Sequence, residues 1–344
     1  MRFTPSLIGT ASRVGSTFAA NTRLHGSMAY RQFSSGTPPP PRKSNPLLTI
    51  GGPVALLAAG YYYYSKKSGQ PVTEVAKEAV KATETPVKKA LNPEEFTPFK
   101  LREVHDVNYN TKLFRFDLPE QDQVLGLHVA SCVLTRFPQE NGKYVVRPYT
   151  PTSDEDQKGF FDLIIKKYKD GPMSEHIHAM KPGDVLEVKG PIPKYPYEAN
   201  KHEEVGLIAG GTGITPMLQL ISAILKDPKD KTKITLLFAN VTEDDILLRS
   251  EFDRLAKEKP NQFKVVYTLD KPPKDWQGET GFVSEDMVKK HMPAPAEGKS
   301  MLFVCGPNGM LQHVCGMKGP NFTQGEVTGV LGKLGYSSNT VYKF

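Results

Sequence analysis

The sequence predicts a β + α/β protein in which a six-stranded antiparallel barrel precedes a parallel-sheet α/β domain. Short runs of alternating apolar and polar residues, separated by turn residues, fill 94–193 and predict the barrel. Apolar strands that alternate with helix-forming segments fill 204–344 and predict a parallel sheet with helices on both faces. Residues 194–203 are the expected linker, and an N-terminal leader and membrane anchor precede both domains.

The N-terminal region carries almost all of the excess positive charge. The chain has 344 residues, and its first 73 contain no Asp or Glu but eight Lys or Arg. Residues 1–45 are also rich in Ser and Thr, which is typical of a mitochondrial targeting leader; a disordered basic tail is the alternative. Removing the eight from 44 bases leaves 36 against 37 acids, so the net charge of +7 does not indicate nucleic acid binding.

Residues 46–64 form an uncharged run of 19 residues. As a helix the run would span about 28 Å, close to the thickness of a bilayer core. Its four final tyrosines suit the membrane interface, and Lys66 and Lys67 suit the head-group layer. The run therefore predicts a single membrane span, with the apolar part of a cleavable sorting signal as the alternative. Residues 65–93 are interpreted as a tether of low order.

The cysteines indicate neither disulfides nor a metal site. Cys132, Cys305 and Cys315 cannot pair evenly and do not have the spacing of metal ligands, so we expect reduced thiols.

The fourth expected barrel strand, 142–147, ends in a motif that suits a flavin dinucleotide. Arg147 supplies a cation for a pyrophosphate, Tyr149 a ring face for packing, and Thr150 a hydroxyl near the redox edge. Pro148 fixes the direction in which the next two side chains project. The alternative is an ordinary strand end. The other strands are expected at 100–105, 112–118, 127–135, 159–166 and 184–190.

A second motif of the barrel domain opens a short helix expected at 175–180. Ser174 is a natural N-cap, Gly171 allows close backbone approach, and Met173 lies between them. Helix N-termini attract phosphate, so the motif suits the same pyrophosphate; an ordinary helix start is the alternative. His176 and His178 would face different directions, and we expect both to be solvated.

A glycine turn joins the first strand of the second domain, 205–210, to its first helix, 217–226. The turn suits a second pyrophosphate, although Pro216 replaces the third glycine of the Rossmann fingerprint and no acid follows in the matching place. Further strands are expected at 233–240, 263–270 and 300–306, and helices at 247–257 and 284–291. The candidate residues of the turn are Gly210, Gly211, Thr212, Gly213, Thr215 and Pro216.

Two further features lie at the carboxyl ends of the strands, where ligands of such sheets bind. Asp270 follows the third strand and could accept hydrogen bonds from an adenosine ribose while repelling a 2′-phosphate, which favours NADH over NADPH. Its alternative is a turn carboxylate. Cys305, Gly306 and Pro307 follow the fourth strand, and the alternative for Cys305 is a small residue that closes a buried strand.

Taken together, these motifs resemble those of the NADH–cytochrome b5 reductase family, in the ferredoxin reductase superfamily. The resemblance covers about residues 97–344 and, with the leader, is greatest to the fungal mitochondrial form. The residues that carry it are Arg147-Pro-Tyr-Thr, Gly171-Pro-Met-Ser, Gly210-Gly-Thr-Gly-Ile-Thr-Pro-Met, Phe238-Ala-Asn-Val-Thr-Glu-Asp-Asp and Cys305-Gly-Pro-Asn-Gly-Met310.

The resemblance implies FAD bound at the barrel and NADH as substrate of the second domain. It places Arg147 and Ser174 at the flavin pyrophosphate, Tyr149 beside the flavin and Thr150 near flavin N5. It also places Lys166 and Tyr168 near the cofactors, and the Thr215 hydroxyl between flavin and nicotinamide. The candidate catalytic residues are then Thr150, Lys166, Thr215 and Cys305, and Met310 joins the cofactor-binding set.

Two positions depart from the family pattern. Asn308-Gly309 replaces two prolines and predicts a looser loop under the nicotinamide. Tyr109 replaces a common histidine, which puts proton handling at that position in doubt.

The function that follows is hydride transfer from NADH to FAD, and then transfer of single electrons to cytochrome b5 or a similar haem protein. Exposed lysines such as Lys167 and Lys169 would meet the acidic surface of that partner. The alternatives are a reductase for another one-electron acceptor and a membrane-tethered NADH-binding protein without turnover. The resemblance places the protein at the mitochondrial outer membrane or in the intermembrane space, and implies no particular oligomer.

Overall fold

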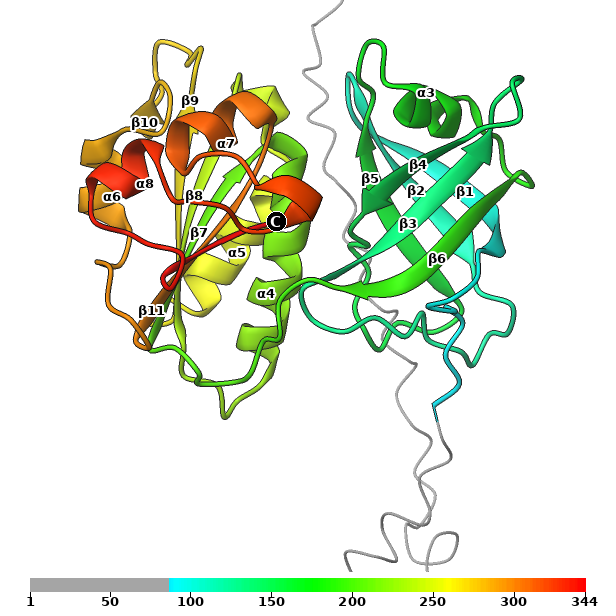
Figure 1. The fold of residues 1–344 in the computed structure, drawn as a ribbon, viewed down its shortest axis with the longest axis horizontal. Coiled ribbons are helices and arrows are strands. Elements are labelled where there is room, and N and C mark those ends of the chain that lie inside the picture. Colours follow the sequence, from blue (N-terminus) through cyan, green and yellow to red (C-terminus); the bar gives the residue numbers. More distant parts are fainter. Residues whose placement is uncertain (1–86) are drawn as a thin grey trace, which may run out of the picture. The chain divides into compact units, whose positions relative to one another are not determined.

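The computed structural model describes residues 87–344, which Figure 1 shows in colour. The predictions of a leader at 1–45 and an anchor at 46–64 lie outside the described residues, as does most of the tether. Within residues 87–344, no helix combines the length and the apolar character needed to cross a membrane.

Six antiparallel strands form the first sheet, in the order β4-β3-β6-β1-β2-β5, which confirms the predicted six-stranded domain. β3 begins at Ser131 rather than at 127, because a tight turn with Ala130 in the left-handed region precedes it. The strands are β1 (Thr97–Asn108), β2 (Thr111–Asp117), β3 (Ser131–Pro138), β4 (Tyr144–Tyr149), β5 (Phe160–Lys166) and β6 (Val185–Pro193).

The expected closure of the barrel is incomplete. Strands β4 and β5 are the two edges of the sheet, and no ladder joins them within residues 87–344. Pro148 in β4 has no N–H to donate to a neighbouring strand. The chain bridges the seam only after β4 has ended, where Thr152 N–H donates to the Asp162 carbonyl at 2.9 Å. The end of β4 that carries the predicted flavin residues therefore keeps an unpaired edge.

Aromatic side chains fill the interior of this domain. Phe161 lies between Phe99, in an edge contact with ring centroids 5.2 Å apart, and Phe116, in a stacked contact at 5.3 Å. All three rings are buried, and each contributes about 1.5–3 kcal/mol of hydrophobic stabilisation. This packed core supports the sheet to which the exposed residues of β4 belong.

The end of the predicted tether packs against this domain. Ala90 and Leu91 donate backbone hydrogen bonds to Val124 and Leu125, and the Leu91 side chain is buried. The packed chain therefore begins before residue 94, the expected boundary.

Helix α3 (Pro172–Ala179) differs from its prediction in two respects. Gly171 is the N-cap and Pro172 occupies the first turn, so Ser174 lies inside the helix and does not cap it. The two histidines are partly buried rather than fully solvated: His176 stacks on Phe137 with centroids 4.0 Å apart, and His178 Nε2 lies 2.9 Å from the Ile165 carbonyl. Burial lowers the pKa of both histidines, because the imidazolium form loses solvation.

The second sheet is parallel, in the order β10-β9-β8-β7-β11-β12, and helices cover both of its faces as predicted (Figure 1). Helices α4 and α5 pack on one face, and α6, α7 and α8 pack on the other. The strands are β7 (Glu204–Gly210), β8 (Lys233–Asn240), β9 (Phe263–Leu269), β10 (Glu279–Thr280), β11 (Ser300–Cys305) and β12 (Val341–Lys343). The helices are α4 (Ile214–Lys226), α5 (Arg249–Glu258), α6 (Glu285–His291), α7 (Asn308–Val314) and α8 (Gly329–Lys333).

The linker at 194–203 is packed. Tyr195 is buried in edge contact with Phe303, with centroids 4.8 Å apart, and its hydroxyl lies 2.9 Å from His202 Nε2. The Tyr342 hydroxyl of β12 donates to the Lys194 carbonyl. The connection between the two domains is thus fixed by side chains of β11 and β12.

Candidate functional site

The end of β4 presents polar groups that make few contacts with the described part of the chain. The exposed Arg147 guanidinium donates only to the carbonyl of its neighbour Val146, at 2.8 Å, and the Thr150 hydroxyl has no partner among the described residues. Tyr149 packs half-buried against the barrel core, and this burial raises its pKa to about 12, so the phenol stays neutral. A cation, a hydroxyl and a neutral ring therefore stand available along one exposed edge, with Pro148 between them.

The start of α3 offers backbone rather than side-chain donors. The buried Ser174 hydroxyl donates to the Gly171 carbonyl at 2.9 Å and accepts from Tyr168 N–H at 3.1 Å. The Met173 side chain is buried in the barrel core. A Cβ on Gly171 would lie 2.7 Å from Ser174 Oγ, so only glycine fits there. The first-turn N–H groups of α3, which contacts β4, are what this motif can offer to a phosphate.

The predicted residues of the two domains meet where β5 ends. The short helix η1 (Gly211–Gly213) lies against β5, and the Tyr168 and Thr212 hydroxyls are 3.0 Å apart. Lys166, the last residue of β5, places its Nζ 3.2 Å from Asp245 Oδ1. No hydrogen bond among the described residues links Thr150 to Lys166 or to Thr215.

Asp245 ends the motif that begins at Phe238, but no role was assigned to it from the sequence. It ends the short helix η2 (Glu243–Asp245), is 4% exposed, and accepts hydrogen bonds from Thr242, Tyr109 and Lys166. Burial alone raises the pKa of this carboxyl, but these hydrogen bonds outweigh that effect and lower it. The sequence offered a weak signal only, an acidic run after the β8 strand.

The glycine turn packs against the end of β11. A Cβ on Gly213 would overlap the Cys305 carbonyl, and a Cβ on Gly210 would overlap the Met310 sulfur, which also lies against Gly306. Gly211 has a φ of 51°, in the left-handed region, and its own side-chain position faces open space. The turns after β7 and β11 are therefore interlocked at the carboxyl edge of the sheet.

The start of α4 is buried beneath this turn. Pro216 and Thr215 are both buried, and the Thr215 hydroxyl donates to the Thr212 carbonyl at 3.2 Å. This hydroxyl thus already stabilises the turn itself.

Cys305 is half-buried, and its burial raises the pKa of the thiol to about 12. The thiol is therefore protonated at neutral pH and lacks the character of a nucleophilic thiolate. All three cysteines are free.

The expected looser loop at Asn308-Gly309 is wrong. Both residues belong to the first turn of α7, and Pro307 is its N-cap. The prolines of the family pattern are not needed for a regular start here, because the capping residue already has the extended conformation that a helix N-cap requires.

Asp270 is exposed immediately after β9, at the same carboxyl edge. Its backbone N–H donates to the Asn240 carbonyl of β8 at 3.0 Å, which fixes its position beside the neighbouring strand. Although the residue is exposed, partial loss of solvation raises the pKa of its carboxyl.

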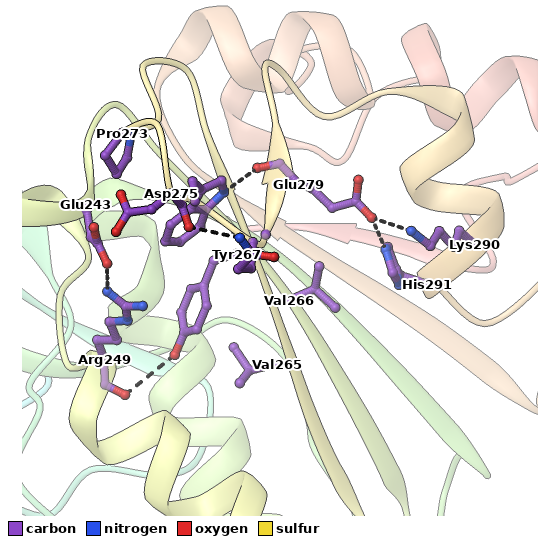
Figure 2. A pocket seen from close by; sticks show the side chains of 13 residues that line it. Glu243, Arg249, Val265, Val266, Tyr267, Pro273, Asp275, Glu279, Lys290 and His291 are labelled. Carbon is purple, nitrogen blue, oxygen red and sulfur yellow. Dashed lines mark hydrogen bonds and ion pairs between the residues drawn. The ribbon is translucent and has the colours of Figure 1, made fainter.

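A hollow of about 520 Å³ lies along β9 and the loop that follows Asp270, and none of the predicted site residues lines it (Figure 2). One oxygen of the Glu279 carboxylate pairs with both Lys290 and His291, at 2.8 and 2.7 Å, and Arg249 lies beside Tyr267 (Figure 2). Trp276 Nε1–H donates to the Glu279 carbonyl at 2.9 Å. These contacts help to fix the loop that follows Asp270.

The residues present fit two dinucleotides. The exposed Arg147 guanidinium and the close-packed Gly171 turn suit one pyrophosphate, and the interlocked glycine turn suits the other. Lys166, Tyr168 and Thr212 mark where the two positions converge.

Comparison with known proteins agrees with this geometry. Residues 98–197 match the oxidoreductase FAD-binding domain family, and residues 207–316 match the oxidoreductase NAD-binding domain family. The chain is 52% identical over 278 residues to NADH-cytochrome b5 reductase 2 of Pyricularia oryzae, covering 80% of this chain and 83% of that protein. It is also 52% identical over 266 residues to an NADH-cytochrome b5 reductase-like protein of Arabidopsis thaliana, covering 76% and 80%.

A solved structure shows the same fold. The cytochrome b5 reductase domain of Ulva prolifera nitrate reductase is 36% identical, with a TM-score of 0.65, and the match covers 74% of this chain and 100% of that domain.

Replacing Gly213 tests the interlocked turns. Gly213→Ala is expected to weaken NAD⁺ binding about tenfold, because overpacking of this kind costs about 1–3 kcal/mol and forces η1 away from β11. Isothermal titration calorimetry measures the change. Lys264→Ala is the control: this exposed residue lies near the start of β9, at the opposite edge of the parallel sheet, so affinity should stay unchanged. Equal affinities for the two variants would contradict the close packing at Gly213.

Proposed function

The chain belongs to the NADH–cytochrome b5 reductase family, and we propose that it oxidises NADH and passes single electrons to cytochrome b5 or a similar haem protein. The observation that carries this function is the meeting of the two nucleotide sites at Lys166, Tyr168 and Thr212. Bound FAD supplies the link between the two halves of the reaction, since it accepts a hydride and releases electrons one at a time.

The residues of the first domain hold and orient the flavin nucleotide. Arg147 and the first-turn N–H groups of α3 would bind its pyrophosphate, and the neutral Tyr149 ring would pack against the flavin. The Thr150 hydroxyl is free to donate or accept at the redox edge. These groups act by placement, so the reaction needs no nucleophilic side chain.

The residues of the second domain bind the nicotinamide nucleotide mainly by shape. The turn from Gly210 to Gly213 receives its pyrophosphate, and Gly306, Pro307 and Met310 close the edge of the sheet beside that turn. Cys305 lines this position as a neutral thiol, because its raised pKa keeps it protonated. These four residues therefore close the edge beside the turn without adding a charge of their own.

An exposed basic segment next to the site suits an acidic electron acceptor. Lys167 and Lys169 flank Tyr168 and are exposed. Lysines in such a position increase the rate of encounter with an acidic haem protein, and the effect weakens as salt rises. The second candidate, a reductase for another one-electron acceptor, would use the same surface.

Removal of the cation at the flavin site tests the function. The purified full chain is expected to be yellow and to reduce cytochrome b5 with NADH, and Arg147→Ala should retain much less flavin, because an unreplaced phosphate contact costs about 1.5–3 kcal/mol. The absorbance of the bound flavin measures flavin content, and the rate of haem reduction measures activity. Lys143→Ala, an exposed lysine near the start of the same strand, is the control. A colourless wild type that binds NADH would instead support the non-catalytic alternative.

Asp270 is proposed to select NADH over NADPH, because its carboxylate accepts from the adenosine ribose and repels a 2′-phosphate. Asp270→Ala or Asp270→Thr should raise the ratio of kcat/KM for NADPH to that for NADH by about tenfold, equal to about 1.4 kcal/mol. Partial loss of solvation raises the pKa of this carboxyl, so discrimination in the wild type should weaken as pH falls and the carboxylate is protonated. Asp275→Ala is the control, and an unchanged ratio for the Asp270 variants would rule out this role.

We propose that residues 1–45 direct the protein to mitochondria and that residues 46–64 anchor it in the outer membrane, with the intermembrane space as a second location. The acid-free leader and the uncharged run support this proposal. After carbonate extraction of mitochondria, the full chain should remain with the membranes and a variant lacking 46–64 should be released. Release of the full chain would refute the anchor.

A further inference from the structure

We propose that Asp245 is a positioning residue. Its carboxylate, in the second domain, fixes the amine of Lys166 in the first domain. Together with Tyr109, it holds the end of β5 against the glycine turn. We call these three residues the clasp. The kinetic effect expected of the clasp rests on the proposed function, whereas the contacts of the clasp do not depend on it.

The two carboxylate oxygens of Asp245 serve different domains. Oδ2 accepts from Thr242 N–H at 3.1 Å and from the Thr242 hydroxyl at 2.8 Å, which anchors the carboxylate within its own turn. Oδ1 accepts from the Tyr109 hydroxyl at 2.9 Å and from Lys166 Nζ at 3.2 Å. The hydrogen bonds to Oδ2 therefore fix the carboxylate in its own turn. Oδ1 in turn fixes the positions of Tyr109 and Lys166 in the first domain.

Burial makes this ion pair different from the others between the domains. Asp245 is 4% exposed and Lys166 is 24% exposed, whereas the side chains of Lys226 and Asp154, which also pair across the domains at 2.7 Å, are 54% and 50% exposed. Exposed pairs contribute about 0–1 kcal/mol, while removing one partner of a buried pair leaves an uncompensated charge. The position of Lys166 is therefore determined by Asp245 rather than by solvent.

Tyr109 acquires a role at the position where the family usually has histidine. Its ring is 74% exposed, yet its hydroxyl donates to the buried Asp245 carboxylate. This hydrogen bond raises the pKa of Tyr109, so the phenol remains a donor throughout the physiological pH range. Beside it, Asn108 Nδ2 donates to the Asp244 carbonyl at 3.0 Å, which ties the same hairpin to η2.

The clasp lies next to the place where the two nucleotide sites meet. Lys166 ends β5, η1 packs against β5, and the Tyr168 and Thr212 hydroxyls lie 3.0 Å apart. A shift of Lys166 therefore changes the approach of the glycine turn to the first domain. Because hydride transfer depends steeply on the separation of the reacting rings, the clasp is expected to affect the rate of the chemical step more than substrate affinity.

Asp245→Asn tests the charge while keeping the shape and a side chain able to cap the turn. In stopped-flow measurements on the flavin-loaded full chain, NADH-dependent flavin reduction is expected to slow about tenfold, with the KM for NADH changed less than threefold and the flavin content unchanged. Asp154→Asn, which breaks the exposed pair, should leave the rate within twofold. A rate for Asp245→Asn within twofold of the wild type would overturn the proposal.

A double-variant cycle separates positioning from general loss of structure. If Asp245 acts through Lys166, then Asp245→Asn should change the flavin reduction rate by less than twofold in a Lys166→Met background, because no ammonium remains to be misplaced. Independent effects that multiply would overturn the proposal. Tyr109→Phe removes a single hydrogen bond and offers a milder variant: a two- to threefold loss of rate is expected, which should vanish in the Asp245→Asn background.

Thermal unfolding tests the clasp without turnover. Asp245→Asn should lower the Tm by several degrees, and Lys166→Met should suppress part of that loss, since it removes the uncompensated charge. Additive shifts in Tm would contradict the coupling. If the wild type showed no NADH oxidation while the Tm shifts were coupled, the proposed function would fail and the clasp would stand.

Discussion

The close backbone contact between Gly213 and the Cys305 carbonyl is the constraint on which the rest of the site depends. It requires glycine at the turn after β7, and it brings the first turns of α4 and α7 to one edge of the sheet. With this edge fixed, Thr212 is held where it meets Tyr168 of the first domain. The close packing at Gly213 in the second domain thus sets where Thr212 lies relative to Tyr168 of the first domain.

The regular elements followed from the sequence because their patterns are long. β8 was predicted at its observed bounds, and α4 at its observed end, since apolar periodicity continues over each element. β12 and α8 were missed, because three and five residues carry too little periodicity to identify them. Ser174 was misplaced by three positions, because a serine that follows Pro172 resembles a cap, although the preceding glycine already has that role.

The site was predictable where a motif is local and was missed where it is assembled from distant segments. Arg147 to Thr150 and Gly210 to Gly213 lie in contiguous runs whose chemistry can be inferred residue by residue. Asp245 gains its importance from Tyr109 and Lys166, which lie 136 and 79 residues away in the chain. A single sequence gives no means of pairing such residues, because the burial that makes the carboxylate matter exists only after both domains have folded.

The two nucleotide positions differ in how many of their hydrogen-bonding groups are already engaged with the protein. At the end of β4, Arg147 has only its neighbour's carbonyl, and Thr150 has no partner among the described residues, so a ligand gains side-chain hydrogen bonds there. At the glycine turn, the hydroxyls of Thr212 and Thr215 are already engaged with Tyr168 and with the turn itself. That position offers mostly shape and backbone donors. Strong binding by free charged groups suits a resident cofactor, and weaker binding by a preformed backbone cradle suits a substrate that must leave after each turnover.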